Sequence, residues 1–246
     1  MAAVWDTPGV MVARGVVGVG LLAVVLAAAP AGAAGEDLVR LDFEEASAGE
    51  PIVEVANTAG TATTQEVLTA GGGSLSAGQV KLLDAIAARF PAYDGAAHGA
   101  RAVIAVTNTG SADVLEPGAA AFRVGATVRL RTKSEGTAYD NGNNVIQRGR
   151  GGDPTQIKLQ VDHRRPMCRV AGADGALSVT SSVRMATRVW YRLRCDRVVL
   201  EDGDRLRLRV TEVRHDGTTS TLTRSRVGPI GAVTFPLATA LSVGAS

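Results

Sequence analysis

The stretch VIQRGRGGDPTQIKLQVDHRRPMCRV, residues 145–170, decides the fold, because it fits two incompatible structures. Its glycine-rich part, RGRGGDP at residues 148–154, is either a loop that cradles a phosphate or the turn of a β-hairpin. A phosphate-binding loop needs a helix after its glycines and usually the lysine of GxxxxGK[ST]. Here Pro154 and then IKLQV follow, in which apolar and polar residues alternate. Alternation is typical of a strand, so this stretch predicts a hairpin.

The same two-residue period recurs on both sides of this hairpin. In RLRLRV, residues 205–210, three arginines alternate with two leucines and a valine, as a strand with one buried and one exposed face requires. TVRLRT at residues 127–132 and YRLRC at residues 191–195 alternate in the same way. Turns rich in Asn, Asp and Gly separate these short runs, which predicts an all-β, antiparallel sandwich or barrel.

The first half of the chain is harder to interpret. Four runs in it are expected to be strands, at residues 38–45, 52–57, 65–69 and 100–109. A fifth segment, GQVKLLDAIAARF at residues 78–90, has the alanine and leucine content of a helix that the following proline would end. A helix at that segment therefore stays open as an alternative.

Residues 1–34 have the order of a secretory signal peptide. Arg14 precedes an apolar run at residues 16–29, and Pro30 and the small residues AGAAG follow. The run is shorter than the roughly 20 apolar residues that a membrane-spanning helix needs. We therefore expect cleavage after Ala33 or Ala34, a secreted, extracellular or cell-wall-associated product forming one domain over residues 36–246, and no membrane span after cleavage.

Export bears on the two cysteines of the chain, Cys168 and Cys195, because thiols pair in an oxidising environment. We expect a disulfide between them that ties neighbouring strands. A loop of this length corresponds to a stabilisation of about 3–4 kcal/mol. A metal site is disfavoured because the cysteines lack CxxC spacing and no HxxxH motif accompanies them.

Charge is distributed unevenly along the chain, although the net charge is only +2. Residues 35–122 carry 4 Lys/Arg against 12 Asp/Glu, a net of −8, and residues 123–226 carry 21 against 11, a net of +10. A basic surface on an exported protein favours anionic partners such as sulfated or uronic glycans, cell-wall polymers or acidic lipid headgroups. The alternative is a solvated sheet face of mixed charge.

Motifs for catalysis are weak. Three histidines lie in polar, turn-like settings and no GxSxG motif accompanies them, which argues against a nucleophile triad. Asp42 and Glu44, and likewise Asp202 and Asp204, share a strand face as glycosidase carboxylates can, but neither pair forms an ExDxE pattern. We therefore expect a protein that is not an enzyme, with a polysaccharide hydrolase or lyase as the alternative.

Calcium is the one metal that the sequence leaves open. The segment YDNGNN at residues 139–144 offers carboxylate, amide and backbone oxygens, which calcium prefers. Tight turns favour the same residue types. We expect no cofactor, with calcium at this segment as the open alternative.

The segment from residue 122 to residue 244 resembles a laminin G-like domain of the concanavalin A-like superfamily, in the form found in exported actinobacterial proteins. FRVGATVRLRT resembles the strand that opens the main sheet of that family, and NNVIQRGRGGDPTQIKLQV resembles its central hairpin. PMCRVAG and WYRLRCDRV resemble its cysteine-bearing strands, and ALSVGA resembles its L-x-I-G strand. Upstream, LDFEE resembles its first strand, and ARFPAYDG resembles a connecting loop, which argues against the helix considered above.

The resemblance implies a jelly-roll sandwich that binds carbohydrate or a cell-surface or cell-wall polymer without catalysis. A purely structural adhesion domain is a further alternative, no nucleic-acid partner is expected, and the oligomeric state stays open. The family's closing strand is not in this chain, so we expect either a fragment or an unpaired edge at LDFEE that invites association. The candidate ligand-binding residues are Asp140, Asn141, Asn143, Asn144, Arg205, Arg207 and Arg209.

Overall fold

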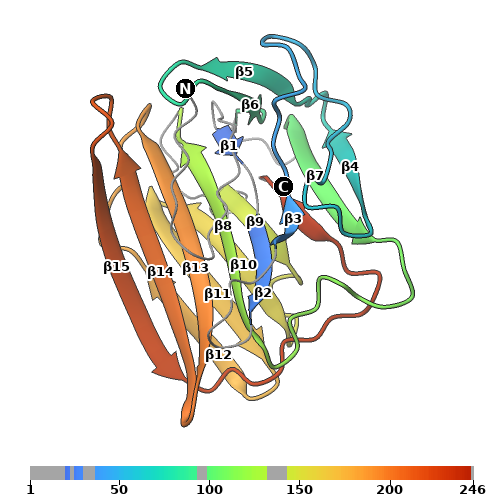
Figure 1. Ribbon diagram of the computed structural model, residues 1–246, viewed down its shortest axis with the longest axis vertical. Helices are drawn as coiled ribbons and strands as arrows, with labels where there is room; N and C mark the ends of the chain where they lie inside the picture. The colour runs from blue at the N-terminus through green and yellow to red at the C-terminus, as the bar shows by residue number, and fades with distance from the viewer. Residues whose placement is uncertain (1–19, 23–24, 30–36, 93–98, 132–142, 245–246) are drawn as a thin grey trace.

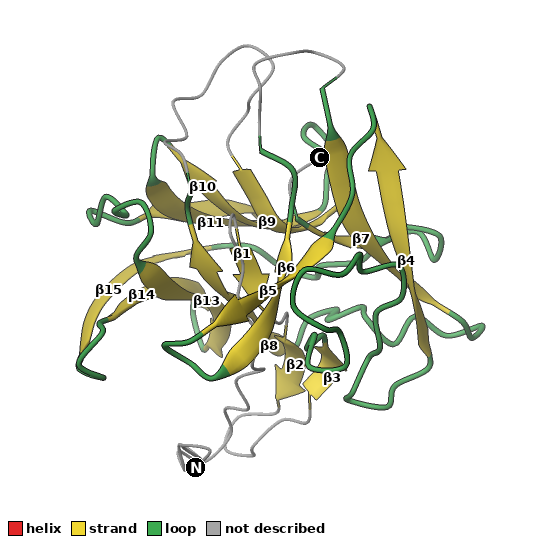
Figure 2. Cartoon of the chain, turned by 90° about the horizontal axis from the view of Figure 1, so that it is seen from above, coloured by secondary structure: helices red, strands yellow, loops and turns green. Residues whose placement is uncertain are grey.

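The computed structural model describes residues 20–22, 25–29, 37–92, 99–131 and 143–244. These residues form two antiparallel sheets that pack face to face, and they contain no helix (Figure 1). Viewed from above, the sheets lie as two layers (Figure 2). The predicted antiparallel β-sandwich is therefore confirmed.

The nine-stranded sheet has the order β15-β14-β13-β8-β1-β6-β5, and β2 pairs with β8 and β3 beside this path. Every pairing in it is antiparallel. Its strands are β1 (Gly20–Leu22), β2 (Val25–Ala29), β3 (Asp37–Arg40), β5 (Ser76–Val80), β6 (Ala85–Arg89), β8 (Ala121–Arg129), β13 (Trp190–Leu200), β14 (Gly203–Val213) and β15 (Thr219–Gly228).

The seven-stranded sheet has the order β12-β11-β10-β9-β16-β7-β4 and is also antiparallel throughout. Its strands are β4 (Thr63–Ala70), β7 (Arg101–Asn108), β9 (Asn143–Arg148), β10 (Gln156–Asp162), β11 (Arg165–Gly172), β12 (Gly175–Thr180) and β16 (Leu241–Val243). Each sheet therefore contains strands from both the N-terminal and the C-terminal half of the chain.

The glycine-rich stretch at residues 148–154 is a hairpin turn between β9 and β10, as predicted. Gly149 has a φ of 76°, and a Cβ built on it would lie 2.2 Å from the Thr155 carbonyl oxygen, so only glycine fits there. The carboxylate of Asp153 accepts the backbone N–H of Arg150 and closes the turn. These glycines serve the turn, which leaves no role for them as a phosphate loop.

The segment at residues 78–90 is not a helix. It lies in the hairpin of β5 and β6, in which Val80 pairs with Ala85 across a four-residue turn that contains Asp84 at a φ of 47°. Of the strands expected upstream, β4 and β7 match their predicted runs, β3 ends at Arg40, and residues 52–57 form no strand. Ile52 and Val55 of that last run are buried although they lie in a loop, whereas Val53 is exposed.

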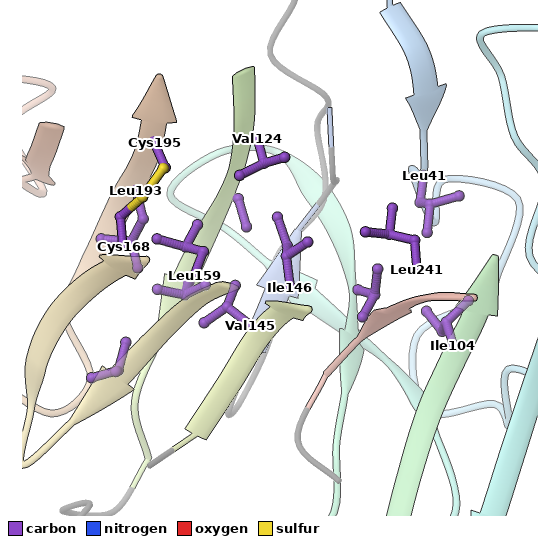
Figure 3. Packing of buried hydrophobic residues seen from close by; sticks show 14 of the residues in the cluster. Leu41, Ile104, Val124, Val145, Ile146, Leu159, Cys168, Leu193, Cys195 and Leu241 are labelled. Atoms are coloured by element: carbon purple, nitrogen blue, oxygen red, sulfur yellow. A yellow bond between two sulfur atoms is a disulfide. The ribbon is translucent and has the colours of Figure 1, made fainter. Parts of the chain in front are cut away.

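The core lies between the sheets and contains the disulfide between Cys168 of β11 and Cys195 of β13 (Figure 3). Both cysteines are fully buried. The pairing is the predicted one, but β11 and β13 belong to different sheets, so the expectation that the bond ties neighbouring strands is wrong. The bond links the two layers through the core.

Strands β1 and β2 come from the apolar run that the sequence predicts to be a signal peptide. β1 pairs with β6 and β8, and β2 pairs with β3 and β8. The rest of residues 1–34 lies outside the described residues. In the intact chain, part of the expected leader thus completes the nine-stranded sheet.

Candidate functional site

The outward side of the nine-stranded sheet carries a cluster of arginines across β8, β13 and β14. Cross-strand pairing puts Arg123 beside Asp196 and Asp196 beside Arg207, and the next row joins Arg194 to Arg209. Because alternate residues of a strand share a side, the arginines of these rows and their neighbours point away from the core. We call this set the arginine face: Arg123, Arg129, Arg192, Arg194, Arg205, Arg207 and Arg209.

The three arginines predicted from RLRLRV belong to this face. Arg205 is exposed and Arg207 and Arg209 are half-buried, whereas the leucines between them are buried. The other four arginines were not among the candidate residues. A signal for two of them was present in WYRLRCD, where Arg192, Arg194 and Asp196 follow each other at intervals of two.

Asp196 is the centre of the arginine face. Its Oδ1 accepts hydrogen bonds from Arg123 Nε at 2.8 Å and Arg194 Nε at 2.7 Å, and its Oδ2 accepts one from Arg207 Nε at 3.2 Å. The carboxylate is 4% exposed, and the guanidinium groups around it are partly exposed. A single negative charge thus holds three positive charges in fixed positions.

The charges of this face leave a surplus of positive charge. Burial disfavours the charged form of Asp196, but Arg194, Arg123 and Arg207 outweigh that cost and lower the pKa of its carboxyl below the usual value. Burial lowers the pKa of Arg209, and the neighbouring Arg207 lowers it further. Because a guanidinium does not lose its proton in a protein, this unfavourable charge makes a bound anion favourable at the face.

Four members of the face have no carboxylate of their own. Within the described part of the chain, Arg192, Arg205 and Arg209 form no ion pair, and Arg129 lies over the ring of Trp190 without one. Beside them, β15 presents hydroxyl groups, since Thr223 pairs with Arg209 and Ser225 pairs with Arg207. Guanidinium groups that alternate with hydroxyl groups can donate hydrogen bonds to carboxylate or sulfate groups that repeat along a polymer.

Two of the four rim residues proposed from the sequence are placed by the structure away from the arginine face. Asn143 and Asn144 begin β9 in the seven-stranded sheet, and Asp140 and Asn141 lie outside the described residues. Among the residues described, no group of three or more His, Cys, Asp and Glu side chains could hold a metal ion.

Asn144 belongs to a second polar group that sequence reasoning missed. Asn144 pairs with Gln160, and Gln147 pairs with Lys158, on the outward side of β9 and β10. Within the described residues, one buried oxygen of each amide has no hydrogen-bond partner: Oδ1 of Asn144, Oε1 of Gln147 and Oε1 of Gln160. We call these three residues the amide cluster. Unsatisfied buried acceptors each cost about 1–3 kcal/mol, so a ligand that donates hydroxyl groups would bind favourably here.

Lys158 adds a positive charge beside the amide cluster. Burial lowers the pKa of its ammonium group, Asp162 raises it, and Arg169 lowers it again. Arg169 itself donates to Gln156 at 3.1 Å. The outward side of β9 and β10 is therefore polar, with Lys158 and Asp162 as its charged residues, unlike the arginine face.

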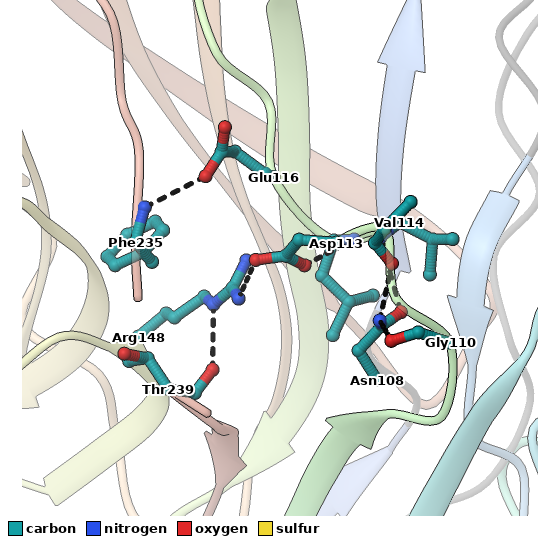
Figure 4. A network of polar contacts seen from close by, with 10 residues as sticks. Asn108, Gly110, Asp113, Val114, Glu116, Arg148, Phe235 and Thr239 are labelled. Carbon is teal, nitrogen blue, oxygen red and sulfur yellow. Dashed lines mark hydrogen bonds and ion pairs between the residues drawn. The ribbon is translucent and has the colours of Figure 1, made fainter. Parts of the chain in front are cut away.

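A buried arginine at the end of the sandwich has a structural role. Arg148 is 1% exposed, pairs with Asp113, donates to the Thr239 carbonyl oxygen, and lies 4.5 Å from the ring centroid of Phe235 (Figure 4). Glu116 accepts the backbone N–H of Phe235 in the same network. These contacts fix the segment before β16 against the segment that precedes β8.

Asp204 and Asp42, two of the carboxylates considered for glycoside hydrolysis, make structural contacts. Asp204 is buried, pairs with Arg197 at 2.7 Å, and accepts the backbone N–H groups of Ile230 and Gly231. Asp202 lies exposed in the turn before β14, and Asp42 accepts a hydrogen bond from Thr58. His163 and His215 are exposed in turns, and His98 lies outside the described residues.

Comparison with protein-family models, curated proteins and solved structures finds no match to this chain. No helix in the described part of the chain is long and apolar enough to span a membrane. Inferences about function therefore depend on the surfaces described above.

Proposed function

We propose that this protein is a secreted, non-catalytic module that binds an anionic glycan or cell-wall polymer through the arginine face. The observation that carries the proposal is the charge of that face: on β8, β13, β14 and β15 the outward positions hold seven arginines and a single carboxylate, Asp196. Such a face attracts a polyanion and holds its acidic groups by guanidinium hydrogen bonds.

The spacing of the arginines fits an extended polymer better than a single small anion. Arg205, Arg207 and Arg209 follow at every second residue of β14, which is a repeat of about 6.8 Å. Arg192 and Arg194 repeat at the same interval on the neighbouring strand, about 4.8 Å away. Two rows of positive charge therefore run along the strand direction, and they lie side by side where Arg194 pairs with Arg209.

A glycan-array screen at low and at moderate salt tests this proposal. We expect binding to sulfated or uronic glycans at low ionic strength that weakens several-fold by about 0.15 M salt, where the Debye length is about 8 Å. A screen that detects neither anionic nor neutral glycans would refute the proposal. Release of reducing or unsaturated ends from a bound polysaccharide would instead support a hydrolase or lyase.

A neutral glycan is the second candidate ligand, because the amide cluster contains three buried acceptors that lack a hydrogen-bond partner among the described residues. Binding there would be insensitive to salt and lost in a Q147L/Q160L variant. Calcium-dependent binding would instead implicate the segment at residues 139–144. The same array, repeated with calcium and with a chelator, separates these outcomes.

A further inference from the structure

Strand β8 lies at a junction in the nine-stranded sheet. On one side β13 pairs with it without interruption from Phe122 to Arg129. On the other side β1 pairs with residues 127–129 and β2 pairs with residues 121–123. The strands β1 and β2 thus pair with the two ends of the edge of β8 that faces away from β13.

The same short segment connects two parts of the sheet. β1 is paired with β6 as well as β8, and β2 is the one partner of β3 among the described strands. Without β1 and β2, the ladder of β15, β14, β13 and β8 would have no hydrogen-bonded connection to β3 or to the β5–β6 hairpin. Strands β1 and β2 therefore occupy internal positions of the sheet.

The space that they fill takes one extended chain. Because β6 and β8 both pair with β1, they lie two strand spacings apart, about 9.6 Å. The register places Leu21 opposite Val128 and Ala28 opposite Phe122, and both β8 residues are core residues with 3–4% exposure. The site therefore suits a single strand of small and apolar residues without charge, which residues 20–29 are.

The cleavage expected near residue 34 would separate this strand from the rest of the chain. We propose that the space between β8 and the strands β3 and β6 is a binding site for one extended apolar strand. Strands β1 and β2 fill it in the intact chain, and the same segment stays bound there as a separate strand once the leader is cut. The backbone groups of β8 supply affinity, as in the addition of a strand to a sheet edge, and the flanking core residues select apolar side chains.

Controlled cleavage of the full chain tests this site. A sequence-specific protease site is inserted between Gly32 and Ala33, and the protein is produced in an oxidising cytoplasm so that export does not remove the leader. After cleavage, we expect the N-terminal fragment to stay with the remaining chain in size-exclusion chromatography and native mass spectrometry. An A28P variant should release the fragment, because proline removes a backbone donor, and the matched A28V variant should retain it.

Hydrogen exchange locates the bound strand. Loss of the fragment should remove the protection of amide groups within residues 121–129, and a synthetic peptide of residues 18–30 with a lysine tail should restore it. Immediate separation of the fragment, with an unchanged Tm and unchanged protection of β8, would overturn the proposal. So would protection of β8 that appears only with dimerisation of the cleaved chain, because a second copy would then occupy the site.

Discussion

At the scale of single residues, Asp196 fixes the positions of three arginines of the arginine face. Its carboxylate is almost fully buried and accepts three guanidinium hydrogen bonds, which keep Arg123, Arg194 and Arg207 in fixed positions on three neighbouring strands. Because these side chains are already ordered, binding a polymer costs less side-chain conformational entropy. A residue at the centre of the candidate site therefore contributes to stability and prepares the surface for binding.

Replacing Asp196 by asparagine should destabilise the protein and make its free energy of unfolding less dependent on pH in the acidic range. We expect D196N to lower the free energy of unfolding by about 2 kcal/mol at neutral pH, since hydrogen bonds to charged groups contribute about 1.5–3 kcal/mol. The folded-state pKa of Asp196 lies below its unfolded value of about 3.9, so its contribution is complete above that value and is lost as the pH falls through the folded pKa.

Urea denaturation between about pH 2 and pH 7 measures this difference, with D202N, in an exposed turn, as the control for charge removal. The stability difference between wild type and D196N should shrink as the pH falls below about 4. A difference that stays constant across this range would show that the carboxylate charge does not stabilise the folded state.

At the scale of elements, the sequence predicted strands well where one face is buried and the other exposed. The alternation in RLRLRV, IKLQV and YRLRC corresponds to β14, β10 and β13, and the glycine turn between β9 and β10 follows from residue chemistry alone. The strand predicted at residues 52–57 is wrong, because Ile52 and Val55 are buried although they lie in a loop. Which strands lie in which sheet could not be predicted, since the period of two does not encode sheet membership.

The disulfide also shows that sheet membership cannot be predicted from the sequence. Its two cysteines were predicted to pair, but Cys168 and Cys195 lie on strands of opposite sheets, and sequence spacing alone does not separate a link within a sheet from one between sheets. The amide cluster was also missed, because Gln147 and Gln160 resemble ordinary solvent-facing strand residues in the sequence. Their unsatisfied oxygens become visible only when β9 and β10 are paired.

Reduction of the disulfide should lower the stability of the protein without any substitution. The bond closes a loop between positions 27 residues apart, and the chain-entropy model gives about 3–4 kcal/mol for such a loop. Because no other cysteine is present, a thiol reductant acts on this bond alone. Denaturation curves with and without reductant should differ by this amount, and coincident curves would show that the link between the sheets contributes nothing to stability.

At the scale of the whole molecule, the uneven charge of the chain corresponds to two regions of the sandwich. The acidic N-terminal half supplies β4 and β7 on the right of the view in Figure 1 and the β5–β6 hairpin at its top, and the basic half supplies β13, β14 and β15 on the left. The sequence predicted this asymmetry and three arginines of the basic surface. Their assembly with Arg123, Arg192 and Arg194 around Asp196 could not be predicted, because it depends on the register of β8, β13 and β14.

Two variants of equal net charge test the central claim that the arginine face binds polyanions. R192Q/R205Q/R209Q removes three arginines that form no ion pair in the described part of the chain, and R150Q/R224Q/R226Q removes three exposed arginines elsewhere, in the β9–β10 turn and on the other side of β15. At about 0.5 kcal/mol for each charge pair, the first variant should bind about tenfold more weakly.

The most direct measurement is the salt concentration at which each variant elutes from a column of immobilised sulfated polysaccharide. We expect R192Q/R205Q/R209Q to elute at clearly lower salt than wild type, and R150Q/R224Q/R226Q to elute close to wild type. Equal elution of the two variants would contradict this expectation, because retention would then follow net charge rather than this face.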